Sequence, residues 1–112
     1  MKTMHRFEVP VDDQWHRFHC PDSDIRKVEA TGSKVEFWCE VSSSSDYSYR
    51  KFRVFGTGHP VPDDAFYVGT ASRTSSGLVW HLYERDDAVV SIKNAQGVQY
   101  GFGNQQSNTF YN

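Results

Sequence analysis

The sequence has only two cysteines, no long apolar run, and neither charge nor proline in its last nineteen positions. Cys20 and Cys39 are too few for a disulfide scaffold, and we expect both thiols to be reduced in the cytosol. No stretch approaches the length of a membrane span, and no apolar run of signal-peptide length follows the basic N-terminus. These absences predict a cytoplasmic protein without a membrane segment.

Charge and composition narrow the class of protein further. The chain carries 12 basic and 14 acidic residues, for a formal net charge of −2, and the two signs are interspersed. No face is therefore forced to bind a polyanion, so we expect no nucleic-acid partner. With 112 residues, 38% of them hydrophobic and 15% aromatic, the chain has room for one modest core and a short appendage.

Residues 34–42 show the clearest strand pattern in the chain. Val35, Phe37, Cys39 and Val41 fall on one face, which predicts a strand with one buried and one wet side. The wet side would carry the intervening residues, namely Lys34, Glu36, Trp38, Glu40 and Ser42.

Residues 50–55 alternate in the same way, and the polar segment between the two patterns suggests a hairpin. No convincing amphipathic helix is present. The pattern predicts an all-β fold, a small antiparallel sandwich or barrel of about seven short strands followed by a C-terminal low-complexity tail. The other expected strands are residues 5–9, 14–18, 25–31, 66–71 and 77–83.

The C-terminal tail, residues 94–112, has a composition unlike the rest of the chain. It contains four Asn, four Gln, three Gly and four aromatic residues and no charge, so copies of it cannot repel one another. This composition is typical of segments that stack in cross-β form, and it predicts self-association. We place a β domain at residues 1–87, and residues 88–93 form either a last edge strand or a linker.

Within the tail, the order of residues 98–104 resembles the core of the RIP homotypic interaction motif (RHIM), an amyloid-forming signalling motif. The later positions resemble its bacterial relatives, in which Gly is followed by alternating Asn, Gln, Asn and an aromatic residue. Tyr100 replaces the expected aliphatic residue, which favours the bacterial type. The resemblance assigns the self-assembly motif to Val98, Gln99, Gly101, Asn104, Gln106, Asn108 and Phe110.

Physical chemistry explains why such residues would suit stacking. Ordering each residue costs roughly 1–2 kcal/mol of backbone entropy, which a lone tail with few apolar groups cannot recover. In a stack, every backbone amide pairs with a neighbouring copy and the Asn and Gln side chains form ladders. Two alternatives stay open: a solvated tail without activity, and an edge strand of the body at residues 98–102, weakened by its glycines.

The body itself resembles an uncharacterised family of small β proteins found in tailed phages and bacteria. The resemblance rests on residues 5–11, 53–60, 67–70 and 77–84, and it implies a fold without an assigned activity. Inside the second segment, Gly56, Thr57, Gly58 and His59 form a candidate ligand loop that could cradle a phosphate. A tight turn whose glycines take positive φ is the alternative interpretation.

Other reactive residues do not form a recognisable set. No paired Cys or His spacing typical of zinc sites is present, and we expect no metal, no cofactor and no catalytic residues. The adjacent acids Asp63 with Asp64 and Asp86 with Asp87 are interpreted as loop residues. Cys39 is expected to be an inert core thiol, and Trp15, Trp38 and Trp80 to pack in the core rather than line a pocket. The other residues that could ligate a metal, scattered along the chain, are His16, His19, Cys20, His59 and His81.

These patterns lead to two hypotheses from different classes. The first is an adaptor or effector of a bacterial or phage amyloid-signalling system, whose tail assembles with itself or with a like-motif partner. The resemblance to bacterial systems implies a nucleotide-dependent defence receptor as that partner. The alternative is a monomeric phage-encoded binding module for a host protein or an unidentified small molecule, with an incidental tail. An enzyme is the third class, and no spacing in the sequence supports it.

Overall fold

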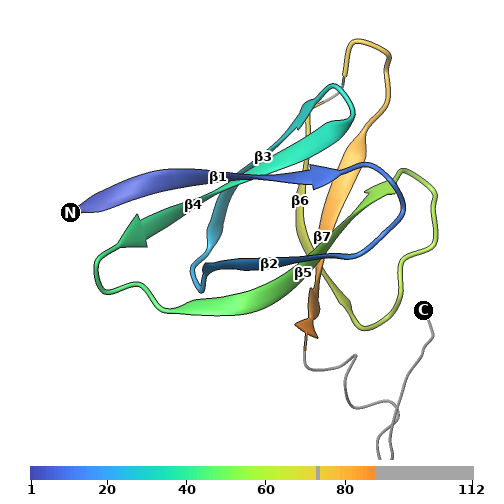
Figure 1. Cartoon of the computed structure of the whole chain (residues 1–112). Coiled ribbons are helices and arrows are strands. Elements are labelled where there is room, and N and C mark those ends of the chain that lie inside the picture. Colours follow the sequence, from blue (N-terminus) through green and yellow to red (C-terminus); the bar gives the residue numbers. More distant parts are fainter. Residues whose placement is uncertain (73, 88–112) are drawn as a thin grey trace, which may run out of the picture.

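The described part of the chain, residues 1–72 and 74–87 of a computed structural model, forms seven antiparallel strands (Figure 1). The predicted all-β class is confirmed, and no helix long and apolar enough to span a bilayer occurs among these residues. The strands are β1 (Lys2–Pro10), β2 (His16–Pro21), β3 (Ile25–Thr31), β4 (Lys34–Ser42), β5 (Tyr47–Gly56), β6 (Ala65–Thr70) and β7 (Trp80–Asp86).

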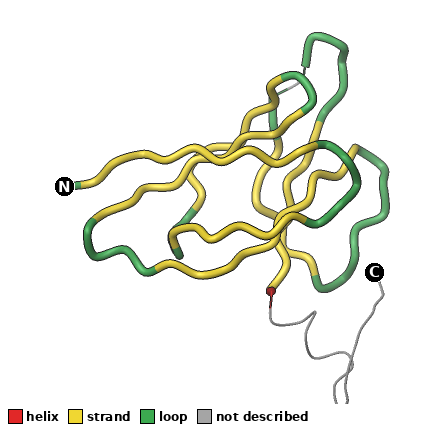
Figure 2. The backbone as a smooth tube through the Cα atoms, viewed as in Figure 1, coloured by secondary structure: helices red, strands yellow, loops and turns green. Residues whose placement is uncertain are grey.

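Two sheets pack against each other as a sandwich. One has three strands in the order β1-β4-β3, and the other has four in the order β2-β5-β7-β6. Loops connect strands of the same sheet and strands of different sheets, as the tube in Figure 2 shows. We call the face of the four-stranded sheet that points away from the core the outer face of that sheet.

The core lies between the two sheets because each presents its apolar alternate residues inward. The rings of Phe37 and Phe52, one from each sheet, lie 4.5 Å apart and join the two layers. The buried cluster consists of Val9, Val35, Phe37 and Cys39 from one sheet and Cys20, Phe52, Val54 and Leu82 from the other.

The expected hairpin between β4 and β5 is wrong. β4 is the central strand of its sheet and pairs with β1 and β3, whereas β5 pairs with β2 and β7. In a hairpin, the apolar residues of the two strands would share one sheet face that a second layer must cover. Placing the strands in opposite sheets lets Phe37 pack on Phe52 instead.

The boundaries of β3 and β4 agree with the prediction to the residue, and β7 differs most. It begins at Trp80 rather than at residue 77, because the preceding segment closes on itself as a turn. The backbone amide of Gly77 donates to the carbonyl of Thr74 at 2.9 Å, and the Leu78 amide donates to Thr74 Oγ1 at 3.1 Å. The amides of Gly77 and Leu78 are thereby occupied by Thr74 and do not pair with a neighbouring strand.

Glu36 was predicted on the wet side of its strand, yet it is only 7% exposed. The guanidinium of Arg6 lies 3.2 Å from one carboxylate oxygen, and Thr31 Oγ1 donates to the other at 3.2 Å. Neighbouring strands on both sides cover the side chain, and its partners offset the cost of removing a charge from water. Side chains on the outward face of a central strand are therefore more buried than the period-two sequence pattern alone implies.

A partly buried ionic clamp ties the four-stranded sheet to the turn that follows β2. Arg50 donates from Nε to Glu84 Oε2 at 2.7 Å and from Nη2 to Glu84 Oε1 at 2.8 Å. Its Nη1 donates to the carbonyl oxygens of Pro21, at 2.8 Å, and Ser23, at 3.0 Å. The Glu84 hydrogen bond is the main cause that raises the pKa of Arg50, so this guanidinium stays charged throughout the accessible pH range.

Candidate functional site

The candidate ligand loop is a tight turn at the end of β5. The amide of His59 donates to the carbonyl of Gly56 at 3.1 Å, and Gly58 has a φ of 89°. Positive φ is therefore confirmed for Gly58, but it is wrong for Gly56, the last residue of β5. Gly56 is tightly packed instead: a Cβ there would lie 3.1 Å from the His59 ring and 3.3 Å from Trp80.

Thr57 begins a chain of hydrogen bonds that runs across the outer face of the four-stranded sheet. Its Oγ1 lies 2.8 Å from Nε2 of His81 on β7, and the other ring nitrogen of His81 lies 3.0 Å from Thr70 Oγ1 on β6. Thr70 Oγ1 in turn lies 2.6 Å from the Tyr67 hydroxyl. A neutral imidazole donates from one nitrogen only, so the direction of the whole chain follows the tautomer of His81.

This arrangement brings a hydroxyl within reach of a general base, which the sequence did not reveal. Thr57 and His81 are 24 residues apart, and only the pairing of β5 with β7 brings them together. A hydroxyl hydrogen-bonded to an imidazole can be activated as a nucleophile, and a third group can orient the ring. Here Thr70 is that third group, and it is a neutral hydroxyl rather than the carboxylate that would stabilise an imidazolium.

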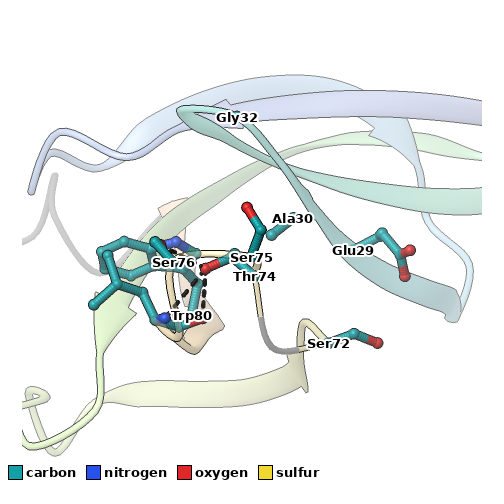
Figure 3. Close-up of a pocket in the computed structure, with 9 residues that line it drawn as sticks. Glu29, Ala30, Gly32, Ser72, Thr74, Ser75, Ser76 and Trp80 are labelled. Atoms are coloured by element: carbon teal, nitrogen blue, oxygen red, sulfur yellow. Dashed lines mark hydrogen bonds between the residues drawn. The ribbon is translucent and has the colours of Figure 1, made fainter.

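Trp80 and Leu78 border two hollows, of which one includes this turn in its lining. The smaller one has a volume of about 310 Å³ and includes Thr57 and His59 in its lining. The larger one, about 500 Å³, is lined mainly by small hydroxyl-bearing residues of the loop before β7 and by the β3 turn (Figure 3). Volumes of this order accommodate small organic ligands. An indole beside several hydroxyls would suit a planar, polar molecule.

The metal candidates do not converge. His16 lies 2.9 Å from Asp12, and His19 packs between Tyr47 and Tyr49. Among residues 1–72 and 74–87, no group of three or more His, Cys, Asp or Glu side chains is arranged to hold a metal ion. Cys20 and Cys39 are free, buried thiols, and Cys39 occupies the core position expected for it.

Burial raises the pKa of Cys20 to about 11 from its ordinary value of 9.0, and burial raises the pKa of Cys39 as well. Between pH 9 and pH 11 the unfolded chain loses the Cys20 proton while the folded chain keeps it, so stability falls as the pH rises. We expect Cys20→Ala to remove on the order of 2 kcal/mol of this pH dependence. Urea unfolding at pH 8 and pH 10.5 measures it, and identical pH slopes for both proteins would contradict the assignment.

The tryptophans and acidic pairs occupy places that the sequence did not specify. Trp80 packs against the core, but core packing is wrong for Trp15 and Trp38. Trp15 covers Phe55 and Arg85 on the outer face, and Trp38 lies beside Lys27 on the other sheet. Trp38 falls on an outward alternate position of β4, and Trp15 lies just before β2, outside the core cluster. Asp63 and Asp64 lie in a turn as expected, whereas Asp86 ends β7.

The self-assembly motif, from Val98 to Phe110, lies outside the described residues, as does the segment 88–93. Comparison with protein-family models matches residues 1–93 to the family DUF7352, a domain of unknown function. No curated protein and no solved structure matches the chain. The chain therefore belongs to this family, which confirms that its body resembles an uncharacterised domain and supplies no activity.

Proposed function

Starting from a domain family without an assigned activity, we propose that this chain is an adaptor or effector whose C-terminal motif assembles in cross-β form. The β-sandwich would be the domain that the assembly carries. The observation behind the proposal is the charge-free tail with Gly, Asn, Gln, Asn and Phe at fixed spacing. The extent of the family match supports it, because the match ends at residue 93 and the charge-free segment begins at residue 94.

The described fold also supports a division between body and tail. The described members of the buried core cluster lie between Val9 and Leu82, with residues from both sheets packed against each other. The tail would then be available for stacking with other copies. The partner would be another copy or a like-motif protein of a bacterial or phage defence system, and the site of action would be the cytoplasm of the bacterial cell.

A peptide of residues 94–112 is expected to form fibrils that bind thioflavin T after a lag, and preformed fibrils should abolish the lag. The lag follows from the cost of ordering the first copies before ladders can stabilise them. A scrambled peptide of identical composition is the matched control, because it keeps the amide content and loses the spacing. A peptide that stays monomeric at high concentration, or a scrambled peptide that assembles equally fast, would exclude the motif.

The second candidate function, a monomeric binding module, is favoured by the turn at Gly56–His59. The hollow beside Thr57 and the hydrogen-bond chain through His81 are features that a ligand could use. Removal of residues 94–112 separates the two functions: the adaptor loses its activity in cells, whereas the binding module keeps it. Replacing Thr57 with Val should have the opposite effect: the binding module loses its activity, whereas the adaptor keeps it.

A further inference from the structure

Strand pairing gathers three cationic side chains into one row across the outer face of the four-stranded sheet. Arg17 on β2 lies directly opposite Lys51 on β5, and Lys51 lies directly opposite Arg85 on β7. Adjacent strands are separated by about 4.8 Å, so three positive charges follow one another across the sheet. Like charges directly opposite each other destabilise a sheet. Folding alone does not favour this row.

The other sheet shows how the same chain compensates a row of like charge. There, Glu8, Glu36 and Glu29 lie opposite one another on β1, β4 and β3. Each of these carboxylates forms an ion pair with a cation from a neighbouring row. Arg6 lies 3.2 Å from Glu36, Lys34 lies 3.0 Å from Glu8, and Lys27 lies 3.9 Å from Glu29. The acidic row is therefore neutralised within its own sheet face.

The cationic row is compensated less completely. Asp87 lies 3.3 Å from Arg17 and 3.8 Å from Lys51, so two cations share one carboxylate. Asp64 lies 2.9 Å from Arg85. The pKa of Lys51 is lowered, mainly by burial, and the charges of Arg85 and Arg17 lower it further against the opposing effect of Asp87. The row keeps a net positive charge in the isolated domain.

Aromatic rows flank the cationic row on both sides. On one side His19 lies opposite Tyr49, a residue that is 51% exposed and has the Arg17 guanidinium 3.8 Å from its ring centroid. On the other side Tyr83 lies opposite both Arg53 and Tyr67, and Tyr67 is 60% exposed.

Arg53 provides a further unsatisfied donor beside the row. Its guanidinium lies over Phe55, 4.5 Å from the ring centroid. Its Nε is buried and has no hydrogen-bond partner in the described part of the chain. A buried donor of this kind usually finds an acceptor.

We propose that the outer face of the β2-β5-β7-β6 sheet binds single-stranded nucleic acid. Phosphates would lie along Arg17, Lys51 and Arg85. Bases would stack on the exposed ring of Tyr67 and, once Arg17 turns from Tyr49 to a phosphate, on the ring of Tyr49. Proteins bind single strands through this combination of a cationic track and accessible aromatic rings. An acidic peptide would use the cations but has no planar bases for the rings, so the flanking aromatic rows favour nucleic acid. The proposal is independent of the C-terminal motif.

The interspersed charges of the sequence led us to expect no nucleic-acid partner, and this inference departs from that expectation. The departure has a physical cause. In the linear sequence Arg17, Lys51 and Arg85 lie far apart from one another, so their order along the chain gives no sign of a row. The register places them in one row and directs them to one face.

The test measures binding of the full chain to a fluorescein-labelled 12-nucleotide oligo(dT) and oligo(U) by fluorescence anisotropy. We expect dissociation constants in the range of about 1–100 μM at physiological salt, weakening steeply as salt rises. A duplex of the same length should bind more weakly, because its bases are not available to stack. An unlabelled 12-residue polyglutamate should compete poorly.

Matched variants locate the surface. Arg17→Gln with Lys51→Gln should weaken binding at least about tenfold and reduce the salt slope by about 1 for each cation removed. Arg26→Gln with Lys27→Gln makes the same change of charge on the other sheet and should leave binding unchanged. Tyr49→Ala should weaken binding at least about fivefold while Tyr49→Phe retains it, because stacking requires the ring and not the hydroxyl. Thermal unfolding of each variant checks that the fold is intact.

Three results would overturn the proposal. The first is no anisotropy change with 100 μM protein at low salt, and the second is equal loss in the Arg17 and Arg26 double variants. The third is equal or stronger competition by polyglutamate, which would indicate an acidic protein segment instead. Failure of these experiments would leave the fibril assay on residues 94–112 unaffected, so the two proposals fail separately.

Discussion

Replacing Glu84 with Gln is expected to lower the free energy of unfolding by about 2–4 kcal/mol, because it removes the charged partner of a partly buried cation. The side chains of Arg50 and Glu84 are only 13% and 23% exposed, so water takes over the charge of Arg50 only in part. Domains of this size have a total stability of roughly 5–15 kcal/mol, so this variant should be close to unfolding at 37 °C. Urea denaturation followed by tryptophan fluorescence measures the change.

Two controls make this result specific. Glu29→Gln removes the same charge from an exposed pair, with 62% and 40% exposure, and should leave stability nearly unchanged. The double variant Arg50→Met with Glu84→Leu removes both charges and should recover most of the lost stability, because no unpaired charge is left buried. If Glu84→Gln and Glu29→Gln have equal effects, Arg50 does not depend on its partner and the clamp is not a stability element.

Replacing Gly101 or Asn104 with Pro is expected to abolish fibril formation by the full chain while the thermal unfolding of the body stays unchanged. Proline has no amide proton, so it removes one backbone hydrogen bond from every layer of the stack and clashes with the extended pairing. The loss repeats in each copy, so the effect on assembly is far larger than the effect on one molecule. Thioflavin T kinetics and sedimentation measure assembly, and circular dichroism measures folding.

Asn112→Pro is the matched control for this pair, because it introduces the same residue outside the motif. It should assemble like the unaltered chain. If Gly101→Pro or Asn104→Pro lowers the unfolding temperature of the body, the tail belongs to the folded domain. Normal fibril formation by both variants would contradict a ladder through these positions.

Much of the fold was predictable because strand formation depends on local pattern. Residues 25–31 and 34–42 form strands with the predicted bounds, since alternating apolar residues bounded by turn residues require no distant partner to be recognised. The inert position of Cys39 follows from the same alternation. The self-assembly motif is also a local pattern, and it rests on the sequence alone because it lies outside the described residues.

Pairing between strands was not predictable in this way. The strands at residues 34–42 and 50–55 were expected to pair as a hairpin, yet β4 and β5 belong to different sheets, because the apolar faces of both strands are buried best against each other. The candidate site shows the same limit. Gly56 and Thr57 were identified from the sequence, but their partners Trp80 and His81 come from another strand.

The amino-acid order was therefore sufficient for the all-β class, most strand positions and the charge-free C-terminal motif, since each depends on residues within a few positions of one another. Tertiary structure alone placed Arg17, Lys51 and Arg85 in one row, buried Glu36, and joined Arg50 to Glu84. The reason is that a period of two assigns each residue to a face, whereas register across a sheet is a global choice made by the packing of the whole core.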